Sequence, residues 1–204
     1  YPEKMIVIRL TCENGCFDVT AKLDCKLRHK MKSQEGLLVL SGEAPSEHNT
    51  NGLSDKQSYS KIDSERGMLF TCAVKSDTDG KKHVSGKGIE ITGATAVTLC
   101  LTAETSFNGW QNSAFTNGKP HLEPCLERLK KDFDYEAVKA AHIADYRALY
   151  SRVELDIGSN GKDNVPTGKR LRDFKTDKND IALYTLLFNY GRYLAIASSR
   201  PGSQ

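Results

Sequence analysis

The sequence has little excess charge of either sign, because its 29 lysine and arginine residues nearly balance its 26 aspartate and glutamate residues. The net charge at pH 7 is only +3. Nucleic-acid binding needs basic residues that cluster on one face, whereas the lysines here are scattered and are typical of a solvated surface. They include Lys30, Lys32, Lys81 and Lys82. We therefore expect no nucleic-acid partner.

Compact catalytic and metal-binding motifs are also missing. The sequence contains no nucleophile elbow, no glycine-rich phosphate loop and no histidine pair at metal-binding spacing. Its six cysteines include no Cys-x-x-Cys pair, and no histidine lies at zinc-finger spacing. We expect neither a zinc site nor another cofactor.

The cysteine pattern does not decide whether the protein belongs to an oxidising or a reducing compartment. Four of them lie within apolar, strand-like runs, where a free thiol behaves as a small buried hydrophobe. These four are Cys12, Cys25, Cys72 and Cys100. Cys12 could instead pair with Cys16 across a turn at Asn14–Gly15.

The sequence has no initiator methionine and no signal-like segment, and it begins at Tyr1 within a strand-like pattern. The absence of a targeting segment is therefore uninformative. We expect both ends to be internal to a longer protein.

Short strands dominate the first half of the sequence. Apolar and β-branched runs, several of them separated by glycine or Asp-Gly turns, predict strands at residues 4–11, 17–24, 37–41, 68–74, 88–92 and 96–103. Many short strands without intervening helices favour an antiparallel β-sandwich over an alternating α/β sheet. Residues 42–66 have no period and predict either a surface insertion or a loop that reaches over a neighbouring domain.

The pattern changes to helix after Thr105. Amphipathic spacing predicts helices at residues 120–131, 134–153, 166–174 and 181–199, with Asp134 capping the second of them. The expected organisation is therefore mixed, β then α, with an antiparallel β-sandwich followed by an α-helical linker.

The last predicted helix is apolar around its whole circumference. Its large apolar residues are Ile181, Leu183, Tyr184, Leu186, Leu187, Phe188, Tyr190, Tyr193, Leu194 and Ile196. Such a helix belongs in the interior of a large domain or in a membrane, and Asn189 and Arg192 near its middle argue against a membrane. Only Arg200–Gln204 follows it, so we expect further polypeptide to enclose this helix.

Candidate catalytic residues are few, and each has a simpler interpretation. His142 with Asp145 and Tyr146 could form an acid/base group, but a hydrogen-bonded histidine in a helix interface is the simpler reading. Glu154 and Asp156 form the only carboxylate pair of interest, and their alternation indicates solvent-facing positions in an extended segment.

Two further residues are candidates for contact with a substrate. Arg200 follows the apolar helix, where it could meet a substrate or interact with the carbonyl groups at the helix end. Trp110, in a loop rich in glycine and asparagine, could stack on a sugar ring. It could instead be a structural plug, that is, a buried side chain that fills a gap in the packing.

Three runs in the second half resemble glycoside hydrolase family 95, the α-L-fucosidase family. They are HIADYRALYSRVELDIG at residues 142–158, VPTGKRL at 165–171 and LFNYGRYLAIASSRPG at 187–202. Residues 40–45, 67–70 and 103–107 resemble strand segments of the N-terminal domain of that family, so the similarity runs in order over nearly the whole chain. Gly168 departs from the acidic residue usual at its position, which affects local helix capping.

The resemblance implies three segments: residues 1–107 as part of an antiparallel β-sandwich, 108–178 as a helical linker, and 179–204 as the first helix of an (α/α)6 toroid. Family members cleave α-L-fucosyl, and sometimes α-L-galactosyl, linkages with inversion, using a glutamate as the acid and an aspartate assisted by asparagines. No residue here matches these catalytic positions, which are expected after Gln204.

The resemblance therefore implies a fragment, inactive by itself, of an enzyme that acts on fucosylated oligosaccharides or polysaccharides. The implied location is secreted or periplasmic, with the missing catalytic domain as an intramolecular partner and no membrane contact. The alternatives are a non-catalytic β-sandwich that binds carbohydrate, through Trp110 for instance, and a structural module with no ligand.

Overall fold

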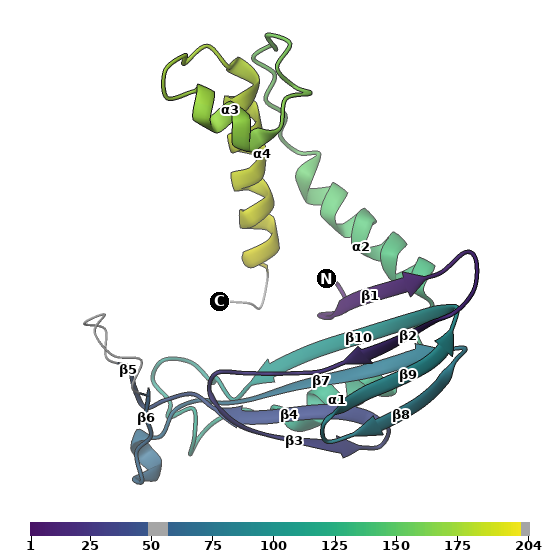
Figure 1. Ribbon diagram of the computed structural model, residues 1–204. Helices are drawn as coiled ribbons and strands as arrows, with labels where there is room; N and C mark the ends of the chain where they lie inside the picture. The colour runs from purple at the N-terminus through teal and green to yellow at the C-terminus, as the bar shows by residue number, and fades with distance from the viewer. Residues whose placement is uncertain (49–56, 201–204) are drawn as a thin grey trace. The chain divides into compact units, whose positions relative to one another are not determined.

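The computed structural model describes residues 1–48 and 57–200. The chain divides into two compact units, one formed by Tyr1 and Glu3–Val138, the other by Pro2 and the residues from Lys139 onward. Strands make up most of the first unit and helices the second (Figure 1). The predicted fold class, antiparallel β-structure followed by helices, is confirmed.

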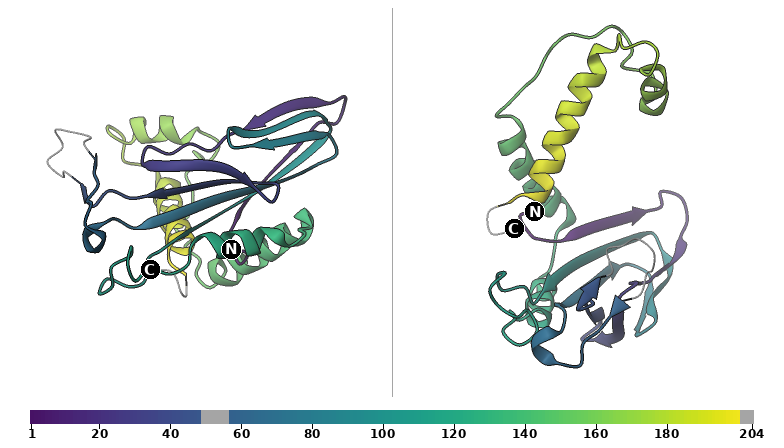
Figure 2. Two further views of the ribbon diagram at one scale, coloured as in Figure 1. Left: turned by 90° about the horizontal axis from the view of Figure 1, so that it is seen from below. Right: turned by 90° about the vertical axis from the view of Figure 1, so that its left-hand side faces the viewer.

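Two antiparallel sheets form the first unit. The larger has the order β1-β10-β7-β4-β3 and consists of β1 (Ile6–Thr11), β10 (Ala96–Thr105), β7 (Leu69–Thr78), β4 (Leu37–Glu43) and β3 (Arg28–Gln34). The smaller has the order β2-β9-β8 and consists of β2 (Phe17–Ala21), β9 (Gly88–Ala94) and β8 (Lys81–Ser85). Figure 2 shows the smaller sheet over one face of the larger.

The predicted loop at residues 42–66 contains some regular structure. A two-stranded ribbon pairs β5 (Glu47–His48) with β6 (Gln57–Ser58), and a 3-10 helix, η1, spans Asp63–Glu65. Residues 49–56 of this loop lie outside the described residues.

Both faces of the larger sheet are buried. Leu38 packs with Val74, Ile89, Ile91 and other residues in a core between the two sheets. Its neighbours on β4, Leu37 and Val39, point to the opposite face, as successive residues of a strand must. Burial on both faces explains why β4 begins with an uninterrupted apolar run.

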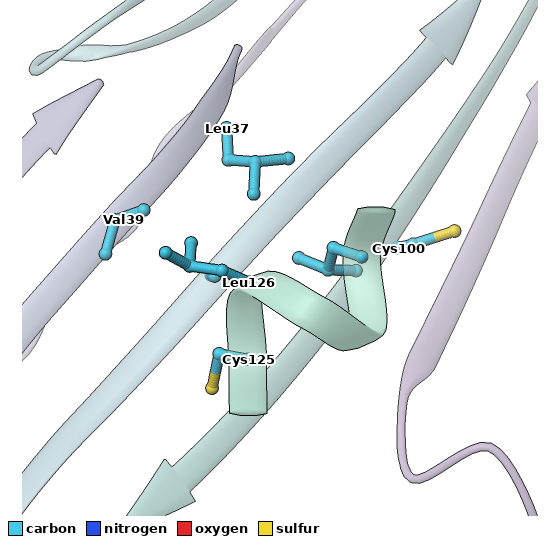
Figure 3. Packing of buried hydrophobic residues seen from close by; sticks show 7 residues of the cluster. Leu37, Val39, Cys100, Cys125 and Leu126 are labelled. Carbon is cyan, nitrogen blue, oxygen red and sulfur yellow. The ribbon is translucent and has the colours of Figure 1, made fainter. Parts of the chain in front are cut away.

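Helix α1 (Leu122–Lys130) covers the outer face of the larger sheet. The core beneath it consists of Leu37, Val39, Ala73, Cys100, Cys125, Leu126 and Leu129. Figure 3 shows labelled members of this cluster gathered between α1 and the strands. Of the four cysteines predicted to act as buried hydrophobes, Cys100 is buried, whereas Cys12, Cys25 and Cys72 are half-buried. Cys125 is also buried, and burial raises the pKa of its thiol to about 11.

Two strands escape prediction from the sequence, β3 and β8. Both lie at sheet edges and are rich in lysine, which protects an exposed edge from pairing with another chain. In β3 only His29, Met31 and Gln34 are half-buried. The predicted solvation of Lys30, Lys32, Lys81 and Lys82 is confirmed.

The second unit contains most of α2 (Tyr135–Tyr150), together with α3 (Thr167–Asp173) and α4 (Ile181–Ser198). Asp134 caps α2, since the Glu136 amide donates to its carboxylate at 3.1 Å. Asp180 caps α4 in the same way, by accepting from the Leu183 amide at 3.1 Å. Among the described residues, no helix is apolar over a length that could cross a bilayer.

Most large apolar side chains of α4 are exposed in this structure. Only Ala182 and Leu183 are buried, whereas Leu187 is 68% exposed and Tyr190 is 55% exposed. At about 25 cal/mol per Å2 of apolar surface, exposure of this many side chains forgoes several kcal/mol of stabilisation.

We predict that Leu129→Ala lowers the free energy of unfolding of the first unit by about 2–5 kcal/mol, because Leu129 of α1 is 1% exposed against the sheet and its truncation leaves a cavity. The measurement is urea unfolding followed by circular dichroism. Leu187→Ala is the matched control and should change stability by less than about 0.5 kcal/mol. Equal effects of the two substitutions would contradict the packing described for α1.

Candidate functional site

The connection from β10 to α1 is a closed loop, residues 106–119, which we call the Trp110 loop. Its ends meet, because the Lys119 amide donates to the Ser106 carbonyl at 3.0 Å. Ser106 is 2% exposed. Its hydroxyl accepts from the Leu69 amide at 2.9 Å, and its own amide donates to the Leu69 carbonyl at 2.8 Å. The base of the loop is thus fixed to β7.

The interior of the Trp110 loop is held by its own asparagines. The Asn112 side chain donates to the Asn108 carbonyl at 2.7 Å, and the Asn108 side chain donates to the Asn117 carbonyl at 2.8 Å. A Cβ atom at Gly118 would lie 2.2 Å from the Ala114 carbonyl oxygen, so this close approach requires glycine. These contacts define a compact surface loop packed by its own groups.

An ion pair and an aromatic ring anchor one side of the loop. The Arg66 guanidinium lies 3.8 Å from the centre of the Phe115 ring, a cation–π contact. The same guanidinium donates to both carboxylate oxygens of Glu43, at 3.0 and 2.8 Å. These hydrogen bonds lower the pKa of Glu43, and Glu43 is 5% exposed. Arg66 therefore joins the end of β4 to the Trp110 loop.

A further contact holds the chain just beyond the loop. His121 precedes α1, and its Nδ1 atom lies 2.8 Å from the Thr71 hydroxyl, which in turn lies 3.2 Å from the Ser41 hydroxyl. Thr71 is fully buried. This chain of hydroxyl groups fixes the start of α1 against the sheet.

Trp110 lies at the turn of this anchored loop and is 86% exposed. Of the two roles predicted for it, the structural plug is therefore wrong. An aromatic ring held in solvent by a fixed backbone is suited to contact with a ligand or another surface. That Trp110 binds substrate stays a prediction.

Arg200, the second predicted substrate residue, lies in the other unit. Its guanidinium pairs with the carboxylate of Asp145, which lies on α2. Only 10% of the Arg200 side chain is exposed. Its contact with substrate stays a prediction.

Aromatic rings and one arginine join α2 to α4 within the second unit. The Arg192 guanidinium lies 4.3 Å from the centre of the Tyr150 ring and donates to the Tyr150 carbonyl. Tyr146 stacks on Tyr150, with 5.3 Å between the ring centres, and lies at a tilt to Tyr193 at 6.3 Å. The contacts of Arg192 with Tyr150 and of Tyr146 with Tyr193 depend on the angle between two helices, so the spacing of the sequence does not predict them.

Several hollows lie among the described residues of the second unit. An apolar one of about 560 Å3 lies between α3 and α4 and is lined by Leu171, Phe174, Tyr184, Leu187 and neighbouring residues. Arg170 and Asp180 form a buried ion pair between the same helices, at 2.9 and 2.7 Å. A smaller hollow of about 340 Å3 includes Glu154, Asn189 and Arg192 in its lining.

The resolved pKa shifts of the described carboxyl groups all have one direction. Every one whose pKa departs clearly from its ordinary value is shifted downward, because hydrogen bonds favour the charged form; these are Glu43, Asp79, Asp177 and Asp180. A general acid needs the opposite shift. Of the predicted pair, Asp156 accepts the Gly158 amide at 2.8 Å and Glu154 is exposed.

The described residues include no group of histidine, cysteine and acidic side chains that could hold a metal ion. All six cysteines are free, so the pairing considered for Cys12 and Cys16 is not formed. The Cys12 thiol instead donates to the Asn14 carbonyl at 3.4 Å.

Two family models match this chain. Residues 1–110 match the model of the glycosyl hydrolase family 65 N-terminal domain, and residues 134–204 match that of the glycosyl hydrolase family 95 catalytic domain. The two matches fall on the strand-rich and helical parts of the structure respectively.

Three named relatives are similar to the chain. Alpha-L-fucosidase 2 of Arabidopsis thaliana is 27% identical over 218 residues, covering 100% of this chain and 26% of the relative. Probable alpha-fucosidase A of Aspergillus niger is 26% identical over 217 residues, covering 100% of this chain and 25% of the relative. Probable alpha-fucosidase A of Aspergillus oryzae is 31% identical over 152 residues, covering 68% of this chain and 21% of the relative. The chain spans about a quarter of the length of these relatives.

We predict that Glu43→Gln loosens the Trp110 loop, because the neutral amide replaces one carboxylate contact of Arg66 with a donor. Hydrogen exchange at the Asn112, Asn117 and Lys119 amides should become roughly tenfold faster. Glu90→Gln, at an exposed position on β9, is the control and should leave exchange unchanged. Unchanged exchange in both variants would contradict the anchoring role of Arg66.

The same ion pair should make the loop sensitive to acid. The pKa of Glu43 lies below its ordinary value of 4.5 in the folded state, so its contribution to stability is complete above pH 4.5 and disappears as the pH falls through the lowered pKa. Exchange at the loop amides, corrected for intrinsic rates, should therefore accelerate only below pH 4.5. The Glu43→Gln variant should lack this step, and a step that remains in it would assign the acid sensitivity to another group.

Proposed function

We propose that the whole protein hydrolyses α-L-fucosyl linkages in glycans. This chain belongs to the glycosyl hydrolases with a family 65-type N-terminal domain, and its helical part matches the family 95 catalytic domain. The observation that supports this proposal is the alignment of two named α-fucosidases, one from a plant and one from a fungus, over 100% of the chain. The order of sandwich and helices in the structure agrees with the order of the two family matches.

The proposed reaction is hydrolysis with inversion. An inverting glycosidase places two carboxyl groups about 6.5–9.5 Å apart, so that a water molecule fits between the base and the sugar. One carboxyl group must remain protonated near neutral pH to donate to the leaving oxygen. The downward pKa shifts of the present carboxyl groups do not suit that role. We propose that the acid and base lie beyond Gln204 and that the 204-residue chain is inactive by itself.

We propose that α4 is the first helix of an (α/α)6 catalytic toroid. The support is its composition, since eight large apolar residues of α4 are more than a third exposed here: Ile181, Tyr184, Leu186, Leu187, Phe188, Tyr190, Tyr193 and Leu194. Neighbouring helices of a toroid would bury this surface, including the apolar hollow beside α3. The Arg170–Asp180 ion pair and the cap at Asp180 fix the start of α4.

The proposed substrate is a fucosylated oligosaccharide or polysaccharide, with α-L-galactosyl linkages as a related possibility. We propose a secreted or periplasmic location, where such glycans are met, and neither a nucleic-acid nor a membrane partner.

The alternative function, a non-catalytic sandwich that binds carbohydrate, is favoured by one observation, the exposed Trp110 ring on its anchored loop.

We predict that the whole protein releases fucose from 2′-fucosyllactose and from an aryl α-L-fucoside, whereas the 204-residue chain alone does not. Fucose release is measured by a coupled dehydrogenase assay or by chromatography. An aryl β-D-galactoside is the control substrate and should not be cleaved. A whole protein that hydrolyses no α-L-fucoside and no α-L-galactoside would reject the proposed activity.

A further inference from the structure

The most exposed large hydrophobic side chain among the described residues belongs to Trp110, the single tryptophan of the chain. A tryptophan ring carries 150–250 Å2 of largely apolar surface. Leaving it in water forgoes several kcal/mol of burial at about 25 cal/mol per Å2. The fold therefore places at this turn a ring that contributes little to its own core.

The backbone that carries Trp110 is held in place by contacts within the protein. The Trp110 loop is closed at Ser106 and Lys119, cross-linked by Asn108 and Asn112, and anchored through Arg66. Binding to a fixed platform avoids most of the cost of ordering a loop. A ring on a flexible segment would lose this advantage, because binding would then have to order the segment.

The surroundings of the ring indicate the chemistry of the ligand. Residues 105–118 include no charged side chain and consist largely of amides, hydroxyl groups and small residues. Gln111, Asn112 and Thr116 are exposed beside the ring in the sequence. Side-chain amides and hydroxyls both donate and accept hydrogen bonds, which suits a neutral polyhydroxylated molecule. A phosphate or an acidic peptide would instead need cationic partners.

We infer that the Trp110 loop is a glycan-binding platform on which the C–H face of a pyranose ring stacks against Trp110, with loop amides bonding the sugar hydroxyls. The identity of the sugar rests on the proposed function. Fucose suits the platform because it is a 6-deoxy sugar, whose methyl group adds apolar surface beside the ring. In this arrangement the sandwich unit holds the glycan and the catalytic residues lie elsewhere in the protein.

A fluorescence titration of the 204-residue chain tests the platform directly, because Trp110 is its only tryptophan. The probes are 2′-fucosyllactose and lactose. We expect 2′-fucosyllactose to cause a saturable blue shift of the emission and to protect it from acrylamide quenching. Saturation by lactose as well would support a platform that accepts pyranose rings in general. Unchanged emission with both sugars, up to their solubility limits, would overturn the inference.

Kinetics of the whole protein supply a second test. Trp110→Ala should raise KM for 2′-fucosyllactose about three- to tenfold, as expected for loss of one aromatic stacking contact, and Trp110→Phe should restore most of this loss. Ile62→Ala, which removes another exposed apolar side chain of the first unit, is the control and should keep the wild-type KM.

The two proposals fail in distinguishable ways. An active wild type whose Trp110→Ala variant keeps the wild-type KM would overturn the platform and leave the proposed function standing. A wild type that hydrolyses no fucoside would reject the proposed function, and the fluorescence titration would then decide the inference alone.

Discussion

Burial of both faces of the five-stranded sheet is the constraint on which the rest of the first unit depends. Leu38 faces the smaller sheet, while Leu37 and Val39 face α1. The chain leaves β10 at Thr105 and must reach the outer face of the sheet before α1 begins at Leu122. The Trp110 loop is that connection. Its position therefore follows from the packing of α1, and its rigidity from the contacts of Ser106 and Arg66.

Two kinds of exposed apolar surface occur in this protein, and they differ in their surroundings. Trp110 is a single ring within residues 105–118, which carry amides and hydroxyl groups but no charged side chain, a setting that suits a small neutral ligand. On α4 the exposed side chains follow one another along the whole helix, with Leu187, Tyr190 and Leu194 on successive turns. A surface of that extent is typical of contact with other polypeptide. We accordingly propose a ligand for the first and helix packing for the second.

Much of this fold could be predicted from the sequence because burial produces recognisable patterns of apolar residues. Strands β4, β7, β9 and β10 are recognisable by their apolar runs, and α4 by its apolar circumference. Asp134 and Asp180 correctly mark the starts of α2 and α4. The order of sandwich and helices follows from these elements, whereas the resemblance to family 95 rests on the motifs at residues 142–158, 165–171 and 187–202.

The parts that escaped prediction depend on position in space. Strands β3 and β8 are polar because they lie at edges, so they lack the apolar run that identifies an inner strand. The Arg66–Glu43 pair joins residues 23 positions apart, and no spacing rule links them. Sequence analysis identified Trp110 as a candidate but left open a buried role, because exposure is decided by packing that a loop sequence does not encode.

We propose that this sandwich and its helices belong to an inverting α-L-fucosidase. The most direct measurement is proton NMR of the fucose that the whole protein releases from an α-L-fucoside, recorded before the anomers equilibrate. Inversion predicts that β-L-fucose is observed first and that the α-anomer grows in later by mutarotation. Initial formation of α-L-fucose, or release of no fucose at all, would contradict the account.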